Sequence, residues 1–486
     1  MNNRKPTEPA SFNKKPIVAV LLVGAFVAIL NQTLLTTALP HLMDDLAINE
    51  NQAQWVTTSF MLVNGIMIPI TAFLIEKFSS RSLFLFAMTL FAAGTLLCAL
   101  SPTFPILMVG RIVQAAGAGV MMPLMQTVFL LIFPIERRGA AMGMVGLVIS
   151  FAPAIGPTLS GWLVGSYHWT ILFWIILPIV IIDIIAAIFL MKNVTTLRNP
   201  RLDISSIVLS TLGFGGLLYG FSNAGQYSWG SMLVVLPIII GVITLMMFIY
   251  RQLHLQTPVL EFRVLRYKVF TLTTVIGMLV FVALVGPATL LPIFMQNTQG
   301  FSALETGLTI MPGAILMGIM SPITGRIFDK VGARTLSIVG LALVFITSAM
   351  YTNLSTTTPL TYLTIVYAIR MFGVSLVMMP VTTAGINVLP RELIPHGTAV
   401  NNTLRQVSGS IGTAILVTVM TSSAAASPGD ENAMVDGFNH AFMVATAIAF
   451  ISLVLAFFIK RNERNDGSQE QEQETQGYNQ KPVTES

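Results

Sequence analysis

Three ionisable side chains, Arg111, Asp183 and Arg370, lie deep within segments that are otherwise apolar. A charge in apolar surroundings is costly, so such residues are candidates for a substrate or ion pathway. An arginine stays protonated and can hold an acceptor on a substrate or lower the pKa of a nearby carboxylate, whereas a buried carboxylate can carry a proton. The alternative is structural: the arginines bind carbonyls of adjacent helices, and Asp183 is a neutral packing acid.

Two asparagines fall at depths similar to that of Arg111. At about 1.5 Å of rise per helical residue, Asn31, Asn64 and Arg111 lie roughly 9 to 14 Å from the expected ends of their segments. We therefore expect them to share one layer, with Asn31 accepting a hydrogen bond from the Arg111 guanidinium. Asp183 lies roughly 21 Å from its segment end by the same count, so a direct pair with Arg111 is not expected. Further side chains that could contact a ligand are polar or adaptable: Gln32, Gln114, Met122 and Gln126.

The apolar segment at 140–164 has a pattern that predicts a particular helix shape rather than a binding site. It contains Pro153 and Pro157, and its small residues recur every four positions, Gly156 among them. Such rows let helix backbones approach closely in lipid, and each proline removes a backbone donor and kinks the helix. The pattern predicts a bent helix pressed against another helix, although an ordinary kinked membrane helix would show it too.

Composition places these elements in a membrane. The chain has 486 residues, of which 54% are hydrophobic and 10% charged, and its mean hydropathy is +0.78. Soluble domains average about 25% charged residues, so this is a polytopic membrane protein. The formal charge of +5 follows from membrane topology and does not indicate nucleic acid. Cys98 is the single cysteine, which excludes a disulfide within the chain.

Counting about 20 apolar residues per span gives fourteen candidate spans. The lysines and arginines that lie in loops are all on the side of the N-terminus, and the opposite loops hold none. By the positive-inside rule both termini are cytoplasmic. The first apolar run, 17–39, is too long for a secretory signal and is expected to remain as a span.

An internal repeat divides the chain. The loop at 72–81 matches 325–334 at an offset of 253 residues, and Arg111 matches Arg370 at an offset of 259. Similar offsets indicate two homologous six-span halves, an arrangement that places a binding site between the halves near the membrane midplane. The expected organisation is a cytoplasmic tail at 1–16, an N-terminal half at 17–191, a linker with two extra helices at 192–268, a C-terminal half at 269–459 and a disordered cytoplasmic tail at 460–486.

Several motifs accompany this repeat. The loop at 72–81 and its copy at 325–334 resemble the pattern G-x-L-a-D-r-x-G-r-r, and the second copy is the more faithful. RIVQAAGAG at 111–119 resembles R-x-x-Q-G, and PAIGPTLSG at 153–161 resembles G-P-x-x-G-G. On these residues the chain resembles the major facilitator superfamily, in its fourteen-span drug:proton antiporter branch of the EmrB/QacA type. NQTLLTTALPH at 31–41 also looks like the lincomycin-resistance efflux proteins of Gram-positive bacteria.

The resemblance implies an all-α membrane fold with 14 transmembrane helices, two six-helix halves plus two extra central helices. It also implies roles for two groups of residues. The first group would form an antiporter motif that favours export: Pro153, Gly156, Pro157 and Gly161. The second would latch the halves together in the outward-open state, unless its charges are solvated topology anchors: Glu76, Arg81, Gly325, Asp329 and Arg334.

One departure from the family pattern affects the expected substrate. The first-span motif D-x-T-x-x-N-x-A-L-P has Asn31 at its aspartate position and Thr36 at its asparagine position. In the family that carboxylate is tied to proton coupling or cation binding. Its replacement disfavours a purely cationic substrate range and leaves the proton carrier unassigned.

The sequence lacks a phosphate-binding loop of the type G-x-x-x-x-G-K-[ST], a nucleophile elbow and a His/Cys metal cluster. We therefore expect no enzyme activity, no cofactor and no metal, and an ion or substrate gradient as the energy source. The expected function is proton-driven export of hydrophobic or amphipathic drugs by a monomer in the bacterial cytoplasmic membrane. The alternatives are an exporter or importer of one metabolite or lincosamide-like antibiotic, and a membrane sensor or scaffold that transports nothing.

Overall fold

The computed structural model describes residues 14–35, 38–198, 200, 203–224, 227–426 and 432–459. Thr36, most of the expected N-terminal tail and the expected tail at 460–486 lie outside these residues. The described residues contain 14 helices that are long and apolar enough to cross a membrane, as predicted. Because this number is even, α1 begins and α15 ends on the same side of the bundle. We call that side the terminal face and the other side the opposite face.

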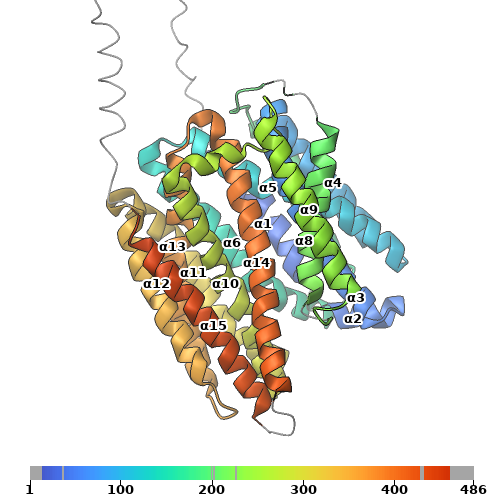
Figure 1. The fold of residues 1–486 in the computed structure, drawn as a ribbon. Coiled ribbons are helices and arrows are strands. Elements are labelled where there is room, and N and C mark those ends of the chain that lie inside the picture. The colour runs from blue at the N-terminus through green and yellow to red at the C-terminus, as the bar shows by residue number, and fades with distance from the viewer. Residues whose placement is uncertain are drawn as a thin grey trace, which may run out of the picture.

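Two groups of helices stand beside each other, coloured blue to cyan and yellow to red in Figure 1. The N-terminal half contains α1 (Lys14–Leu34), α2 (Leu39–Leu46), α3 (Glu50–Lys77), α4 (Ser80–Ala99), α5 (Phe104–Ile132), α6 (Arg138–Val164) and α7 (Ile171–Leu190). The C-terminal half contains α10 (Lys268–Ile293), α11 (Ala303–Val331), α12 (Ala333–Met350), α13 (Leu360–Asn387), α14 (Ile394–Ala425) and α15 (Ala433–Ala456). Short 3-10 turns at Ile135–Arg137, Phe262–Arg266, Tyr351–Asn353 and Arg391–Leu393 and a π turn at Phe294–Thr298 complete the described elements.

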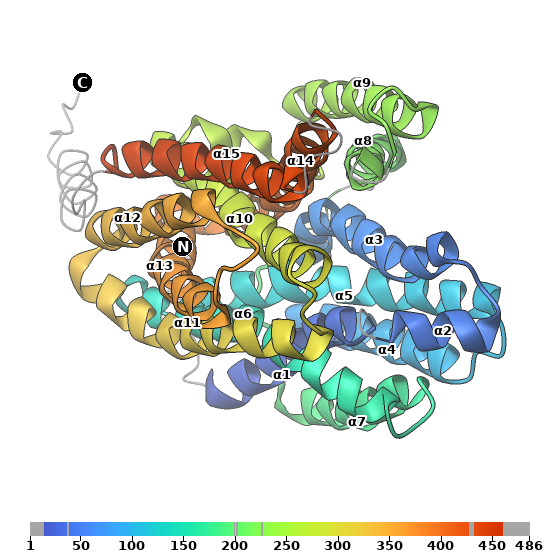
Figure 2. The same ribbon diagram turned by 90° about the horizontal axis from the view of Figure 1, so that it is seen from below.

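The extra pair, α8 (Ile204–Ala224) and α9 (Met232–His254), lies at the edge of the bundle rather than between the halves. α8 packs on α9, α3 and α14, and the end-on view of Figure 2 shows the pair outside both groups. The two helices approach closely at Gly216, where an added Cβ would lie 2.7 Å from the Pro237 carbonyl oxygen. Small residues at such a crossing suit helix association in lipid, where van der Waals packing drives contact.

The first span is shorter than the run 17–39 suggests. α1 ends at Leu34, and a separate helix, α2, follows with Pro40 in its first turn, where a proline is tolerated. Asp45 of α2 accepts a hydrogen bond from Trp169 Nε1 at 2.8 Å and contacts His168 at 3.0 Å. The bond from Trp169 is the main reason that the pKa of Asp45 lies below its ordinary value. These contacts fix α2 against the loop before α7.

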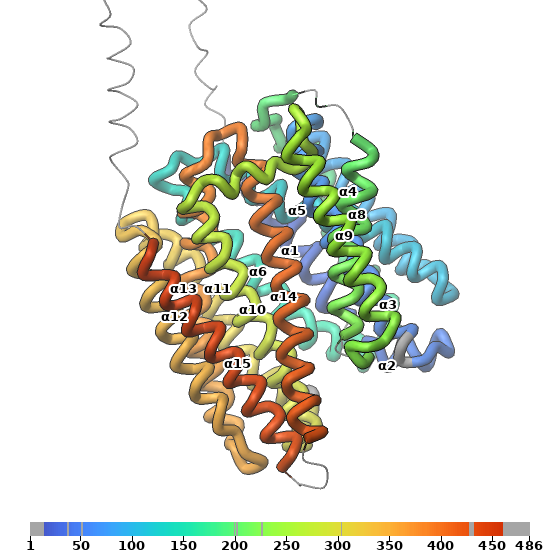
Figure 3. Tube along the Cα trace, in the orientation of Figure 1, coloured from blue at the N-terminus to red at the C-terminus, as the bar shows by residue number. Residues whose placement is uncertain are grey.

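The halves meet mainly through α6 and α11, and also through α3 with α14 and α5 with α14. The tube drawing of Figure 3 shows the same arrangement, because α14 lies beside α8 and the N-terminal half. Large apolar side chains fill each half, and Phe60, Phe84, Phe129, Phe270 and Phe294 are fully buried. Each half is thus a packed body, and the polar residues described below lie within or between these bodies.

Candidate functional site

Arg111 is fully buried on α5 and holds three acceptors. Its Nη1 donates to Asn31 Oδ1 at 2.6 Å and to Gln114 Oε1 at 2.7 Å, and its Nε donates to the Val56 carbonyl at 3.2 Å. Gln114 Nε2 in turn donates to Thr95 at 2.7 Å. The hydrogen bond expected between Asn31 and Arg111 is therefore present, and it joins α1 to α5. Bonds to a buried cation are among the stronger ones in proteins.

Asn64 does not belong to this cluster, which corrects the single layer expected from the sequence. The Arg111 guanidinium stacks on Phe60, with its carbon 4.1 Å from the ring centroid. Asn64 lies one turn further along α3, where its backbone packs against Gly119. The depth was miscounted because α3 begins at Glu50, several residues before the assumed start of the span.

Arg370 occupies the equivalent place in the C-terminal half. It is fully buried on α13, and it donates to Ser348 Oγ at 2.6 Å and to the Ala283 carbonyl at 2.8 Å. These bonds join α13 to α12 and α10. Both arginines thus bind neighbouring helices, and their roles in transport stay predictions.

Asp183 on α7 is separate from Arg111, as expected. It is buried at 4% exposure and lies against Gly24 of α1 and Phe84 of α4. Its Oδ2 has no hydrogen-bond partner among the described residues. Asp183 is also the one acidic residue in the described part of the chain that is buried. Its surroundings belong wholly to the N-terminal half.

The halves are joined at the terminal face by a carboxylate on a helix N-terminus. Asp329 of α11 accepts hydrogen bonds from the backbone N–H groups of Gly139, at 2.8 Å, and Ala140, at 2.9 Å. The first turn of α6 presents unpaired N–H groups and a partial positive charge, so a carboxylate is favoured there. Gly325, one turn earlier on α11, touches the backbone of Gly139, because a Cβ added at Gly325 would lie 2.1 Å from the Gly139 carbonyl oxygen.

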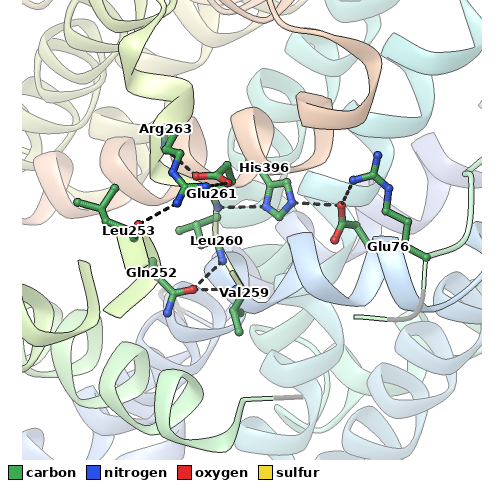
Figure 4. A network of polar contacts seen from close by, with 9 residues as sticks. Glu76, Gln252, Leu253, Val259, Leu260, Glu261, Arg263 and His396 are labelled. Carbon is green, nitrogen blue, oxygen red and sulfur yellow. Dashed lines mark hydrogen bonds and ion pairs between the residues drawn. The ribbon is translucent and has the colours of Figure 1, made fainter. Parts of the chain in front are cut away.

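The first copy of the loop also joins the halves, through a histidine. Glu76 at the end of α3 lies 3.2 Å from Nε2 of His396 in the first turn of α14, and 3.7 Å from Arg198 (Figure 4). His396 Nδ1 accepts the backbone N–H of Glu261 at 3.2 Å, so in the neutral ring Nε2 carries the proton and donates it to Glu76. The sequence alone assigned His396 no role, because nothing in it indicates that this histidine meets Glu76.

Three further hydrogen bonds connect the halves on the same side of the molecule. Arg138 Nη1 donates to Asn387 at 2.9 Å, and Asn402 Nδ2 donates to Gln126 Oε1 at 2.8 Å. Arg391 Nη2 donates to the Leu131 carbonyl at 3.2 Å. Gln126 lies six residues before the end of α5 at the terminal face. The polar contacts that join α3, α5 and α6 to α11, α13 and α14 therefore gather toward the terminal face.

The predicted antiporter helix α6 packs against both halves. A Cβ added at Gly146 would lie 2.9 Å from Ser321 of α11. A Cβ added at Gly156 would lie 2.2 Å from Thr33 of α1. Pro153 and Pro157 lie inside a continuous helix. Gly161 has open space around it. α6 and α11 also line a pocket of about 370 Å³, in the part of these helices that is farther from the terminal face.

The remaining predicted residues lie apart from these contacts. Arg81 donates to the Ile188 carbonyl at 2.5 Å, at the end of α7, so it stabilises the N-terminal half rather than joining the halves. Arg334, Gln32 and Met122 are half-buried, and Met122 packs against the apolar core.

Sequence reasoning missed Arg405. This residue is buried on α14 at 5% exposure, with its guanidinium carbon 5.1 Å from the centroid of the Phe281 ring on α10. The signal was available, because Arg405 is a basic residue inside an apolar segment of span length. It stands among polar residues, Asn401, Asn402 and Gln406, which weaken the apolar pattern that made the other arginines conspicuous.

Comparisons with known proteins agree with this architecture. Residues 21–413 match the Major Facilitator Superfamily. The chain belongs to the major facilitator superfamily. It is 59% identical over 459 residues to the uncharacterized MFS-type transporter YcnB of Bacillus subtilis, covering 94% of this chain and 97% of the relative. It is 41% identical over 458 residues to the lincomycin resistance protein LmrB of the same organism, covering 92% and 96%.

The fold is also that of solved members of the superfamily. The proton:xylose symporter XylE superposes with a TM-score of 0.65 at 12% identity, covering 92% of this chain and 96% of XylE. Relatives of the multidrug export type, at lower identity, confirm the EmrB/QacA branch that the motifs indicated. The chain is therefore a multi-pass membrane transporter and not an enzyme.

Proposed function

We propose that this transporter exports hydrophobic or amphipathic drugs from the bacterial cytoplasm in exchange for protons, as a monomer with one chamber between its halves. The observation that carries the proposal is the gathering of inter-half contacts at the terminal face, where Asp329 binds the N-terminus of α6. The basic loops lie on this face, so it is the cytoplasmic face by the positive-inside rule. The conformation is then closed to the cytoplasm.

Alternating access follows from breaking these contacts. Transporters built from such repeats usually close one face at a time, and they alternate between faces when one rigid half rocks against the other. The contacts of Asp329 and Glu76 lie at the ends of helices, so both can break without disrupting either half. The chamber then opens to the cytoplasm, and a drug can enter.

Proton exchange requires a group that titrates, and we propose Asp183. It is the buried acid of the described helices and one of its oxygens lacks a partner. Replacing Asp183 with Asn keeps the size and removes the titration. In membrane vesicles, Asp183→Asn should lose transport against a drug gradient while keeping downhill exchange of drug. Uphill transport at the wild-type rate would exclude Asp183 as the proton carrier.

Accumulation of a fluorescent dye in cells tests the export itself. Cells that express the protein should accumulate less ethidium or Nile red than cells with an empty vector, and a protonophore should abolish the difference. Arg111→Ala should reduce export, because it leaves Asn31, Gln114 and the Val56 carbonyl without their shared donor. Equal accumulation with and without the protein would support a sensor or scaffold that moves nothing.

A narrower exporter is the second candidate, favoured by the 41% identity to a protein named for lincomycin resistance. The test is a panel of toxic compounds that includes lincomycin and unrelated amphipathic drugs. Protection against one lincosamide alone supports the narrow pump. Protection against several chemical classes supports the multidrug exporter.

A further inference from the structure

Arg405 lies at the depth where a chamber between the halves would end. It is eleven residues into α14, about 16 Å from the terminal end of the helix at 1.5 Å per residue. The hydrogen bond between Asn402 and Gln126 closes the interface on the terminal side, about one helical turn closer to that face. Arg405 therefore stands directly beyond this closure, toward the opposite face.

Arg405 differs from Arg111 and Arg370, which are also buried within membrane helices. Arg111 and Arg370 each donate hydrogen bonds to neighbouring helices. Arg405 donates none to the described residues, and its contact is the face of the Phe281 ring. A ring stabilises the flat side of a guanidinium but accepts none of the five N–H groups along its edge. No described residue accepts a hydrogen bond from this mostly buried cation, and none of its nitrogens is among the fully enclosed atoms without a partner, so its N–H groups remain accessible to a ligand.

The groups near Arg405 are donors as well. Asn401 lies one turn away on the same helix face, and both side chains reach within 3.8 Å of a Cβ position at Gly277 on α10. The Nδ2 of Asn401 and the Nε2 of Gln126 are buried and have no acceptor among the described residues. Gln126 accepts a hydrogen bond from Asn402, the next residue along α14, which faces α5 rather than α10. The cation of Arg405 and the amide donor of Asn401 therefore lie together without a carboxylate among the described residues to receive them.

We propose that Arg405, with Asn401, binds an anionic group, such as a carboxylate, on an amphipathic substrate. The inference rests on the proposed function for its place in transport, but the binding itself can be tested alone. An arginine edge matches a carboxylate with two parallel hydrogen bonds, and the ring of Phe281 receives the apolar part of the ligand beside it. When the halves rock, the bond between Asn402 and Gln126 breaks, and the same site becomes open to the terminal face.

Two dansyl compounds that differ in one group test this proposal. Dansylglycine carries a carboxylate, and dansylglycinamide carries a neutral amide in its place. Binding is measured as the increase of dansyl fluorescence with the purified full chain in lipid nanodiscs, after subtraction of empty nanodiscs. The wild type should bind dansylglycine about tenfold more tightly than the amide, as expected for one charged hydrogen-bonded pair.

Arg405→Gln should remove this preference and leave the affinity for the amide unchanged, and Arg405→Lys should keep part of it. The matched control is Arg266→Gln, which removes an exposed basic residue from the loop before α10 and should retain the full preference. The melting temperature of Arg405→Gln should equal or exceed that of the wild type, since an uncompensated cation is removed. An arginine kept for structure would lower it.

Equal binding of the two compounds by the wild type, or an unchanged preference in Arg405→Gln, would overturn the proposal. If Arg405→Gln fails to fold, Gly277→Leu fills the adjoining space and keeps the charge, and undiminished dansylglycine binding in that variant would overturn it as well. Export of Nile red by cells expressing the wild type separates the two hypotheses. Wild-type export without a preference for dansylglycine contradicts the anion site alone, and a wild-type preference without any export contradicts the proposed function alone.

Discussion

At the scale of residues, Asn31 supplies a neutral acceptor to a buried cation. Its Oδ1 lies 2.6 Å from Arg111 Nη1, a distance typical of a charge-assisted bond. An aspartate at this position would form the same bond and cancel the charge. With asparagine, the α1–α5 cluster keeps a net positive charge inside the N-terminal half, which disfavours cationic ligands nearby.

Two substitutions at Asn31 test the importance of this bond. Asn31→Leu leaves the guanidinium without one acceptor and should lower the free energy of unfolding by about 1.5 to 3 kcal/mol, the range for a hydrogen bond to a charged group. Asn31→Asp retains the acceptor and should be at least as stable as the wild type. Denaturant titration in detergent measures both. Equal destabilisation by Leu and Asp would contradict the bond as the cause.

At the scale of elements, the α6–α11 contact depends on two backbones that touch. Gly139 and Gly325 have no room for a side chain, since an added Cβ at Gly325 meets the Gly139 carbonyl. Spin labels at Glu136 and Lys330, which are exposed on either side of this contact, report the separation of the helices. Gly325→Val should lengthen the distance between the labels, because the side chain forces the helices apart at the terminal face.

The control for this experiment is on the same helix. Gly307 of α11 has open space around it, so Gly307→Val should leave the distance unchanged. Cys98 is buried and is first replaced by Ser to avoid labelling there. An identical distance in wild type and Gly325→Val would show that the contact does not hold the terminal face closed.

An ion pair between Asp203, just before α8, and Arg251 joins α8 to α9. Asp203 binds Arg251 through two hydrogen bonds, at 2.7 and 3.0 Å, and accepts a third from Ser206 at 2.6 Å. The bond from Arg251 is the main cause that lowers the pKa of Asp203 from 3.8 to about 2. Because the folded pKa lies below the unfolded one, the stabilisation is present at neutral pH and is lost as the pH falls through about 2.

Asp203→Asn therefore has an effect that depends on pH. At pH 7 the variant should exchange the amide hydrogens at the end of α9 faster than the wild type does. The difference should shrink as the pH falls from about 4 to about 2, because the wild-type carboxylate becomes protonated. Hydrogen exchange of both proteins at each pH measures this, since the intrinsic pH dependence cancels. A difference that stays constant down to pH 2 would assign the stabilisation to other groups.

At the scale of the whole molecule, the sequence predicted the number of membrane spans and their division into two halves. Hydropathy and the placement of basic residues gave fourteen spans, and the repeat gave two halves with Arg111 and Arg370 in equivalent places. These features depend on composition and period, which a single sequence displays. The pairing of Asn31 with Arg111 was predicted correctly even though α1 ends at Leu34, earlier than the expected end of the first span.

Features that depend on the meeting of distant elements could not be predicted in this way. The contact of Glu76 with His396 and that of Asp329 with the start of α6 arise only when the halves are packed together. The position of the extra pair at the edge of the bundle follows from the close packing of α8 on α9, α3 and α14, which hydropathy does not reveal. Arg405 was overlooked because the polar residues around it, Asn401, Asn402 and Gln406, weaken the apolar pattern of its segment.

Transport by purified protein in liposomes with an imposed pH gradient tests the central claim, that the two halves enclose a chamber that exchanges drug for protons. Nile red, a neutral dye, should accumulate on the side that represents the cell exterior only when that side is acidic, and collapse of the gradient by a protonophore should stop it. Accumulation at the same rate without a pH gradient, or none in either condition, would contradict the account.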